Sequence, residues 1–243
     1  MEKSILRKPS DIKDVFGAFL LEGSQFSKGM YDMPVVKSNI DDLPKQLISY
    51  SRVGKGQLAI PPGTALHFYV YDYLFDGEYG IWNSLIRGTE FKRGFNLQKL
   101  QGFDYIIVPD FSLYLDMPVA MQIWNIYRSR VVAYALQQLG YKVIINVRWT
   151  DENSYKFCFN GIEKGSIVSV GSYGCSKNKV DMVLFNAGLE KMIKEIKPSA
   201  IIFYGTVKES TKELLEKYEQ RYIAFSSDTA KAMEKTRHGN ESK

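Results

Sequence analysis

The segment FDYIIVPDFSLYLDMPVAMQIWNIYRSRVVAYALQQLGYKVIINV, residues 103–147, decides the fold class. It begins and ends with short apolar runs rich in β-branched and aromatic residues, at 103–108 and 142–147, and residues 117–139 between them have helical periodicity. Apolar runs without polar alternation are typical of parallel strands that are covered on both faces. A strand, a helix and a second strand in this order predict a right-handed crossover within a parallel sheet.

The same alternation recurs along the chain from about residue 66. Further apolar runs lie at residues 66–74, 166–171, 200–204 and 221–225, and further helical segments at residues 79–101, 152–161, 177–196 and 208–219. The predicted fold class is α/β, a mainly parallel sheet of about six strands with flanking helices. The sheet is either an open doubly wound sheet or an incomplete barrel, and periodicity does not separate these two.

Three regions are expected along the chain. Residues 1–65 contain one amphipathic segment, around Ile12 to Leu21, and then a long stretch punctuated by proline and glycine. This stretch predicts an irregular N-terminal arm or lid over the sheet. Residues 66–235 form the predicted α/β domain, and residues 236–243 a disordered tail.

Composition excludes several classes of protein. The 243 residues are 45% hydrophobic and 24% charged, enough for one sizeable core, and no apolar run reaches the length of a membrane span. We expect a cytoplasmic protein. With only two histidines, His67 and His238, a multi-histidine metal site is impossible, and a histidine-dependent catalytic unit would need His67. The two cysteines, Cys158 and Cys175, form no metal-binding or disulfide pattern.

The net charge of +5 attracts polyanions weakly. Much of the basic excess lies in the last third of the chain, where lysines alternate with glutamates. A solvated helix face explains this pattern better than a nucleic-acid patch does, although both interpretations remain open.

The helix predicted at residues 117–139 has clear end signals. Asp116 can cap its N-terminus, Pro118 suits its first turn, and Gly140 can end it in a left-handed conformation. On a helical wheel one stripe, expected to be buried, contains Met121, Trp124, Arg128, Val131, Val132 and Ala135. A second, polar stripe contains Gln122, Asn125 and Ser129.

Arg128 therefore falls within the apolar stripe. An unpaired guanidinium there would be very costly, so Arg128 needs a carboxylate or a bound anion. The carboxylates nearest in sequence are Asp110 and Asp116. Arg130 lies two positions further along and is expected to face solvent.

Candidate site residues follow the predicted strands. Parallel strands bring their carboxyl ends to one edge of a sheet, and ligands bind there. Three aspartates at this edge, Asp72, Asp110 and Asp151, are the catalytic candidates, because grouped carboxylates can hold a divalent cation such as Mg²⁺ or take a proton from bound water. The structural alternative is that Asp110 pairs with Arg128, and Asp116 serves as a cap more readily than as a catalyst.

Other positions at this edge suit ligand binding. In GSYGCSK, residues 171–177, the backbone around Tyr173 and Gly174 could cradle a phosphate or simply form a tight turn. Trp149 and Tyr173 could stack on a base or a sugar, or could cover the core. Gly205 follows another predicted strand. Cys158 reads as a buried thiol, since no base lies near it in sequence.

Several blocks of the sequence resemble one protein family. PDFSLYLDMP, WNIYRSR, GYKVIINVRW, SYKFCFNGIEKGSIVSVGSYG and IKPSAIIFYG, within residues 66–205, resemble the signature of domain of unknown function 4417, found in bacteria and phages. Carried onto this chain, the family's motif positions are Asp110, Ser112, Tyr114, Asp116, Trp124, Arg128, Arg130, Trp149, Ser154, Gly161 and Gly205. One departure is Asn146, which stands where the family often has proline. The resemblance implies phages and mobile elements rather than a particular reaction.

Three functions remain open. The first is binding of a nucleotide or nucleic acid at the carboxyl edge, with an arginine of the helix at phosphate, aspartates at a metal ion or water, and an edge aromatic at the base. The second is a hydrolase of a small molecule or sugar that uses Asp110 with Asp116 or Asp151 as acid and base. The third is a protein that binds a partner without catalysis. Substrate, cofactor and protein partner are not determined by the sequence.

Overall fold

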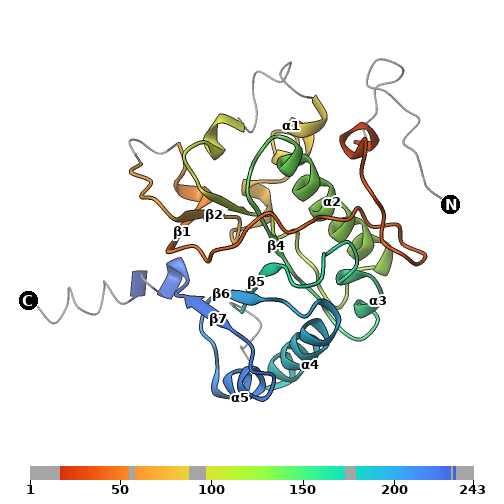
Figure 1. Ribbon diagram of the computed structural model, residues 1–243, viewed down its shortest axis with the longest axis vertical. Helices are drawn as coiled ribbons and strands as arrows, with labels where there is room; N and C mark the ends of the chain where they lie inside the picture. The colour runs from red at the N-terminus through yellow and green to blue at the C-terminus, as the bar shows by residue number, and fades with distance from the viewer. Residues whose placement is uncertain (1–16, 55–57, 88–96, 173–178, 231, 234–243) are drawn as a thin grey trace, which may run out of the picture.

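The fold is a seven-stranded, all-parallel sheet. The computed structural model describes residues 17–54, 58–87, 97–172, 179–230 and 232–233. The strands are β1 (Gln46–Ser49), β2 (Thr64–His67), β3 (Tyr105–Ile107), β4 (Val143–Asn146), β5 (Ile167–Gly171), β6 (Ala200–Tyr204) and β7 (Tyr222–Phe225). They pair in chain order, and the sheet curls until it nearly closes into a barrel (Figure 1). The predicted α/β class and parallel sheet are confirmed, in the barrel form.

The helices lie outside the curled sheet (Figure 1). They are α1 (Ile81–Arg87), α2 (Val119–Gln138), α3 (Tyr155–Cys158), α4 (Lys179–Ile196) and α5 (Glu209–Lys217). Four 3-10 turns are also described, η1 (Ala18–Leu21), η2 (Tyr50–Arg52), η3 (Asp72–Leu74) and η5 (Leu97–Leu100). Residues 88–96, in the middle of the helix predicted at 79–101, and the predicted tail at 236–243 lie outside the described residues.

Side chains alternate between two cores along the central strands. Ile107 and Ile144 belong to a cluster inside the barrel, whereas Ile106 and Ile145 belong to the larger cluster between the sheet and the helices. All four are buried, which explains why the strands read as unbroken apolar runs. Burial on both faces therefore accounts for the unbroken apolar runs from which these strands were predicted.

The sheet has seven strands, in agreement with the prediction of about six, and the additional strand is β1. β1 lies within the segment predicted to be an irregular arm, and β2 begins two residues before the predicted boundary at residue 66. β1 lies in a stretch rich in turn residues, so its local signal is weak. Its strand conformation is fixed by parallel pairing with β2, from Gln46 opposite Thr64 to Ser49 opposite His67.

The described part of the N-terminal arm runs across the amino-terminal ends of the strands. Val36 donates its backbone N–H to the carbonyl of Gly161 at 2.8 Å. Asn39 accepts the N–H of Val143, the first residue of β4, at 3.0 Å. Ile40 enters the core inside the barrel. This edge is opposite to the carboxyl ends of the strands, so this part of the arm is not a lid over them.

The two ends of α2 differ in how well they were predicted. Gly140 has φ 87° and follows the last turn, as expected for a helix that ends in a left-handed residue. The N-terminal cap is Pro118, with no side-chain capping bond, and Asp116 is exposed. The prediction that Asp116 caps this helix was therefore wrong.

The buried face of α2 was predicted correctly at Val131, Val132 and Ala135 but wrongly in the first turns of the helix. The polar stripe of Gln122, Asn125 and Ser129 is buried, whereas Met121 and Trp124 are 53% and 38% exposed. Gln122 and Asn125 face inward because their amide groups donate to backbone carbonyls of the loop before α2, which compensates for their burial. A helical wheel compares only the hydrophobicity of the faces of a helix, so it does not show hydrogen bonds between a polar face and a loop.

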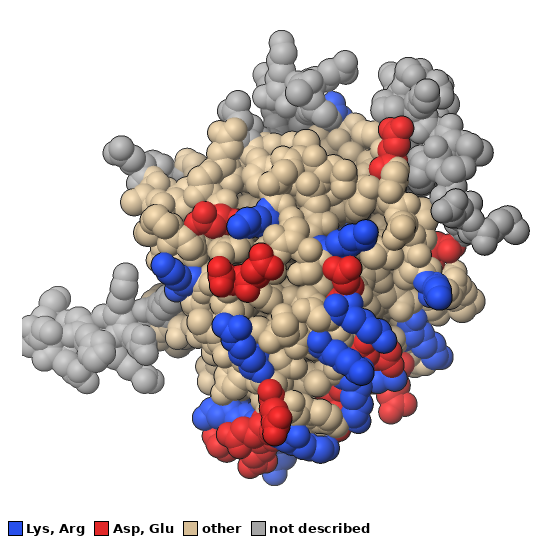
Figure 2. All heavy atoms as spheres, viewed as in Figure 1, with Lys and Arg blue, Asp and Glu red and all other residues tan. Residues whose placement is uncertain are grey.

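The basic residues of the last third lie on a mixed-charge surface. Figure 2 shows lysine and arginine interspersed with aspartate and glutamate over α4 and α5. Glu190 accepts from Lys194 at 3.1 Å and from Lys217 at 3.2 Å, and Lys212 binds Glu209 at 2.9 Å. These pairs favour the solvated-face interpretation over a nucleic-acid patch. No helix in the described part of the chain is long and apolar enough to cross a membrane.

Glu190 predicts a specific acid sensitivity. Hydrogen bonds from Tyr218, Lys194 and Lys217 lower its pKa to about 2 from an ordinary value of 4.5. Because the folded pKa is the lower one, the stabilisation is complete above about pH 4.5 and is lost as the pH falls toward 2. We expect Glu190→Gln to flatten the pH dependence of urea unfolding in this window, by at most about 1 kcal/mol because the site is partly exposed. Glu209→Gln is the control, and an equal effect there would contradict the assignment.

Candidate functional site

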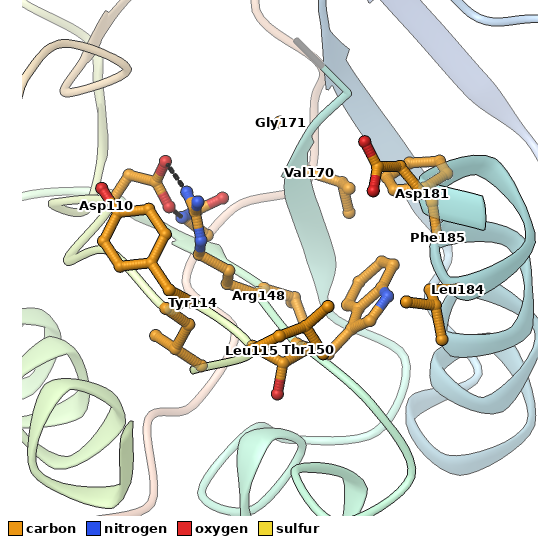
Figure 3. Close-up of a pocket in the computed structure, with 14 residues that line it drawn as sticks. Asp110, Tyr114, Leu115, Arg148, Thr150, Val170, Gly171, Asp181, Leu184 and Phe185 are labelled. Carbon is orange, nitrogen blue, oxygen red and sulfur yellow. Dashed lines mark hydrogen bonds and ion pairs between the residues drawn. The ribbon is translucent and has the colours of Figure 1, made fainter. Parts of the chain in front are cut away.

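A cavity of about 350 Å³ opens at the carboxyl ends of the central strands (Figure 3). We call it the site cavity. Its walls come from the loop after β3, from the end of β4 and the residues after it, from the end of β5, and from the first turns of α4. This is the edge at which ligands bind in parallel α/β sheets. The sequence predicted a site at this edge of the sheet, but it did not single out most of the residues that line the cavity.

The polar side of the site cavity is built on Asp110. Its carboxylate accepts from Asn146 Nδ2 at 2.6 Å and from Arg148 Nη1 at 2.5 Å. The side chains of Asp110 and Arg148 are 14% and 29% exposed. A largely buried carboxylate requires such donors, and charge-assisted hydrogen bonds are the stronger kind. The pair therefore holds Asp110 in one orientation at the cavity wall.

A chain of hydrogen bonds inside the barrel orients Asn146, which in turn donates to Asp110. Tyr69 donates its hydroxyl to Asn146 Oδ1 at 2.8 Å and lies 2.7 Å from the Ser169 hydroxyl. Burial, and secondly the charge of Asp110, raise the pKa of Tyr69 well above its ordinary value, so it remains a donor. A Cβ on Gly171 would lie 2.9 Å from the Tyr69 ring, which explains the glycine there. The chain fixes which way the Asn146 amide points.

The opposite side of the site cavity is apolar. Trp149 packs on Phe185 and Phe159, with ring centroids 5.5 Å and 6.2 Å away. A Cβ on Gly188 of α4 would lie only 2.0 Å from Trp149 Nε1. The absence of a side chain at Gly188 therefore lets the indole rest against the helix backbone. In Figure 3, Leu184 and Phe185 face the cavity across from Asp110 and Tyr114.

The buried polar stripe of α2 positions the loops of the site cavity. Gln122 donates to the carbonyls of Tyr114 and Met117 at 3.3 and 2.9 Å, and it accepts from the Thr150 hydroxyl at 2.9 Å. Asn125 donates to the carbonyl of Ser112 at 2.7 Å. The sequence pattern gave no signal for this role, because the partners are backbone carbonyls of the loop before α2 and the hydroxyl of Thr150, and periodicity does not show such contacts.

The predicted catalytic aspartates do not form one cluster. Asp110 lines the site cavity, whereas Asp72 accepts from the backbone N–H and hydroxyl of Ser112 at 3.0 and 2.8 Å. Asp151 accepts the backbone N–H of Asn153 at 3.1 Å, in the turn before α3. Among the described residues, no group of three or more histidine, cysteine, aspartate or glutamate side chains could hold a metal ion.

The two arginines of α2 have other partners than those predicted. Arg128 donates to both oxygens of Asp76, at 2.9 and 2.8 Å, and lies over the Phe111 ring at 4.1 Å. Arg128 is therefore paired with a carboxylate, as its burial requires. The carboxylate is Asp76 of the loop after β2, and not Asp110 or Asp116.

Arg130 was predicted to face solvent and is fully buried. It donates to the carbonyls of Asn160 at 3.1 Å and Cys158 at 2.7 Å. Burial lowers its pKa to about 10, which leaves the guanidinium charged at neutral pH. Arg130 therefore connects α2 to the turn after α3 and does not reach the site cavity.

The remaining predicted residues are scattered. Tyr114 and Trp149 line the site cavity, whereas Gly205 forms the turn after β6 with φ 116°. Tyr173 and Gly174 lie outside the described residues. Cys158 is buried, and burial raises the pKa of its thiol, which disfavours a nucleophilic role.

Residues 26–222 match the family described as Domain of unknown function (DUF4417). The chain belongs to this family. The DUF4417 region contains β1 to β6 and every described residue that lines the site cavity, so the resemblance seen in the sequence extends over the barrel.

Two curated phage proteins are similar to the chain over 182 residues, which is 75% of its length. One is the Gene 1 protein of Mycobacterium phage D29, at 32% identity, and the other is the Gene 1 protein of Mycobacterium phage L5, at 33%. The aligned region spans 63% of the D29 protein and 74% of the L5 protein. No solved structure matches the chain.

Proposed function

We propose that the chain binds a small molecule of nucleoside size in the site cavity, either free or as the nucleoside part of a nucleotide. The single observation that carries this proposal is the cavity itself, which has Asp110 and Asn146 on one side and the apolar side chains Trp149, Leu184 and Phe185 on the other. A volume of about 350 Å³ falls within the range of small-molecule sites. A ligand with one flat apolar face and several hydroxyl or amine donors suits these two sides.

The charged residues that line the site cavity favour binding of the base and sugar of a nucleotide inside it over binding of the phosphate. Its described charged residues are Asp110, Asp181 and Arg148, and Arg148 is already bonded to Asp110. Arg128 and Arg130, which the sequence suggested for phosphate, are bonded elsewhere. A phosphate inside would therefore face a net negative charge among the described lining residues, so we propose that it lies outside the cavity.

A thermal-shift screen of nucleosides, nucleotides, sugars and oligonucleotides tests the proposal. A ligand present at 100 times its dissociation constant stabilises the folded protein by about 2.7 kcal/mol, or roughly 5–10 °C for a chain of this size. We expect a nucleoside to produce this shift, and its monophosphate to produce no larger one. A shift with sugars alone, or with none of these ligands, would reject the nucleoside assignment.

Two variants separate binding from stability. Asp110→Asn removes the negative charge and replaces one acceptor oxygen with an amide donor, and it should weaken nucleoside binding about ten-fold or more. Leu184→Phe fills the cavity and should weaken binding while leaving the hydrogen bonds intact. Leu139→Phe, at a position that is 55% exposed outside the cavity, is the matched control. Urea unfolding of each variant shows that the fold is preserved, and unchanged affinity in both cavity variants would contradict the location.

A second candidate, hydrolysis, is favoured by one observation. Asp181 enters the site cavity from α4, on the opposite side from Asp110 (Figure 3). Two carboxylates that flank a ligand can serve as acid and base. The partners predicted from sequence, Asp116 and Asp151, do not line the cavity. Under this function Asp181→Asn would abolish turnover of a bound ligand, followed by mass spectrometry, while binding persists. Binding without turnover in the unmodified protein would exclude it.

A further inference from the structure

The loop between β2 and α1 has an unusual composition. Its thirteen residues, FYVYDYLFDGEYG at 68–80, include four tyrosines and three acidic residues but no lysine or arginine. The chain as a whole carries a net charge of +5. We call this segment the tyrosine loop. Its charge is opposite in sign to that of the whole chain.

The tyrosine loop is anchored at several points. Phe75 is fully buried and packs edge-on against Phe68 and Phe111, with centroids 5.7 and 5.6 Å away. Asp72 is bound by the backbone and hydroxyl of Ser112, and Asp76 by Arg128. These contacts fix the shape of the loop, so a partner that binds it would not have to order it first.

The same loop displays aromatic rings to solvent. Tyr71 and Tyr73 are 77% and 76% exposed, and their rings lie nearly parallel at 13° with centroids 5.9 Å apart. Tyr79 is 53% and Leu74 is 40% exposed. Exposed aromatic surface on a fixed loop is typical of an interaction site, because tyrosine buries a large area with little loss of side-chain freedom.

The charges beside the rings indicate what kind of partner fits. Asp72 accepts hydrogen bonds from the backbone N–H and hydroxyl of Ser112, and these neutral donors do not offset the charge of a carboxylate. Glu78 is 63% exposed, and Arg87 lies 4.0 Å from it. A lysine or arginine of a partner would gain from both the carboxylates and the ring faces, whereas the phosphates of a nucleic acid would be repelled.

We propose that the tyrosine loop is a docking surface for a basic segment of a partner protein. Tyr71 and Tyr73 provide the contact area and the cation–π faces, and Asp72 and Glu78 provide the opposite charge. The docking residues Tyr71, Asp72, Tyr73 and Glu78 do not line the site cavity, and a partner bound to them does not require the ligand proposed there.

Fluorescence anisotropy with defined probes tests this proposal. The probes are a labelled peptide rich in arginine and lysine, its counterpart with glutamate at the basic positions, and a labelled oligothymidine. We expect the basic peptide alone to bind, with an affinity that falls as salt is raised. The double variant Tyr71→Ser with Tyr73→Ser should weaken binding about ten-fold or more, and Glu78→Gln should weaken it less.

The control is Met30→Ser, which removes an 81% exposed apolar side chain outside the loop and should leave binding unchanged. Three results would overturn the proposal. One is failure of the basic peptide to bind, and another is binding that the double tyrosine variant does not alter. The third is oligothymidine binding, or self-association in sedimentation, that depends on these tyrosines in place of peptide binding.

Discussion

Replacing Arg130 with alanine is expected to lower the free energy of unfolding by about 3–4 kcal/mol. The side chain is fully buried, and its Nε and Nη2 atoms hold the carbonyls of Asn160 and Cys158. Alanine would leave both carbonyls without their donors and a large cavity between α2 and the turn after α3. Urea denaturation followed by circular dichroism measures the loss.

Two further variants identify the cause of this loss. Arg130→Met keeps most of the side-chain volume but removes the donors and the charge, so it should cost less than alanine. Arg87→Ala removes an arginine side chain that is 46% exposed and should change stability by no more than about 0.5 kcal/mol. If Arg130→Ala is as mild as Arg87→Ala, the buried guanidinium does not hold the turn after α3.

Replacing Gly188 with alanine should destabilise the protein by about 2–3 kcal/mol. Alanine favours a helix by about 1 kcal/mol over glycine, so an isolated helix would predict the opposite sign. The new Cβ would, however, lie 2.0 Å from Trp149 Nε1 and 2.2 Å from Trp149 Cδ1. Either the indole or α4 must move, and both form the apolar wall of the site cavity.

A double-mutant cycle shows whether the indole is responsible. With Trp149→Leu already in place, Gly188→Ala should become neutral or stabilising, because the clash is gone and the helix preference remains. Equilibrium unfolding of the four proteins gives the coupling energy. A loss of the same size in both backgrounds would mean that Gly188 is required for another reason. Ligand affinity should fall with Gly188→Ala as well, since the cavity wall shifts.

The sequence predicted the strands and the edge of the sheet better than it predicted the partners of individual side chains. Strands β2 to β6 were visible because burial on both faces leaves few polar residues in them, whereas β7 is only partly buried and was visible from its β-branched and aromatic residues. The edge that carries the site cavity also followed from the sequence, since parallel strands share one direction. β1 was missed because its four residues owe their conformation to pairing with β2 rather than to their own composition.

Partners in the site could not be predicted in the same way. Asp110 was singled out and does line the site cavity, but its partners are Arg148 and Asn146 rather than Arg128. Asp181 was not singled out, because an aspartate in the first turn of a helix is common and carries no local signal of a cavity. Asp110 follows β3, and Asn146 and Arg148 lie at and just after the end of β4, so the pairing of these two strands in the folded sheet brings them together.

By itself the sequence determined the α/β class, the parallel direction of the strands and the family. These depend on periodic burial and on residue blocks, which are local properties of the chain. Only the tertiary structure decided that the sheet nearly closes, that α2 buries its polar stripe, and which carboxylate each arginine meets. The physical reason is that a buried charge or amide needs a partner but does not specify which one, and the packing of distant loops makes that choice.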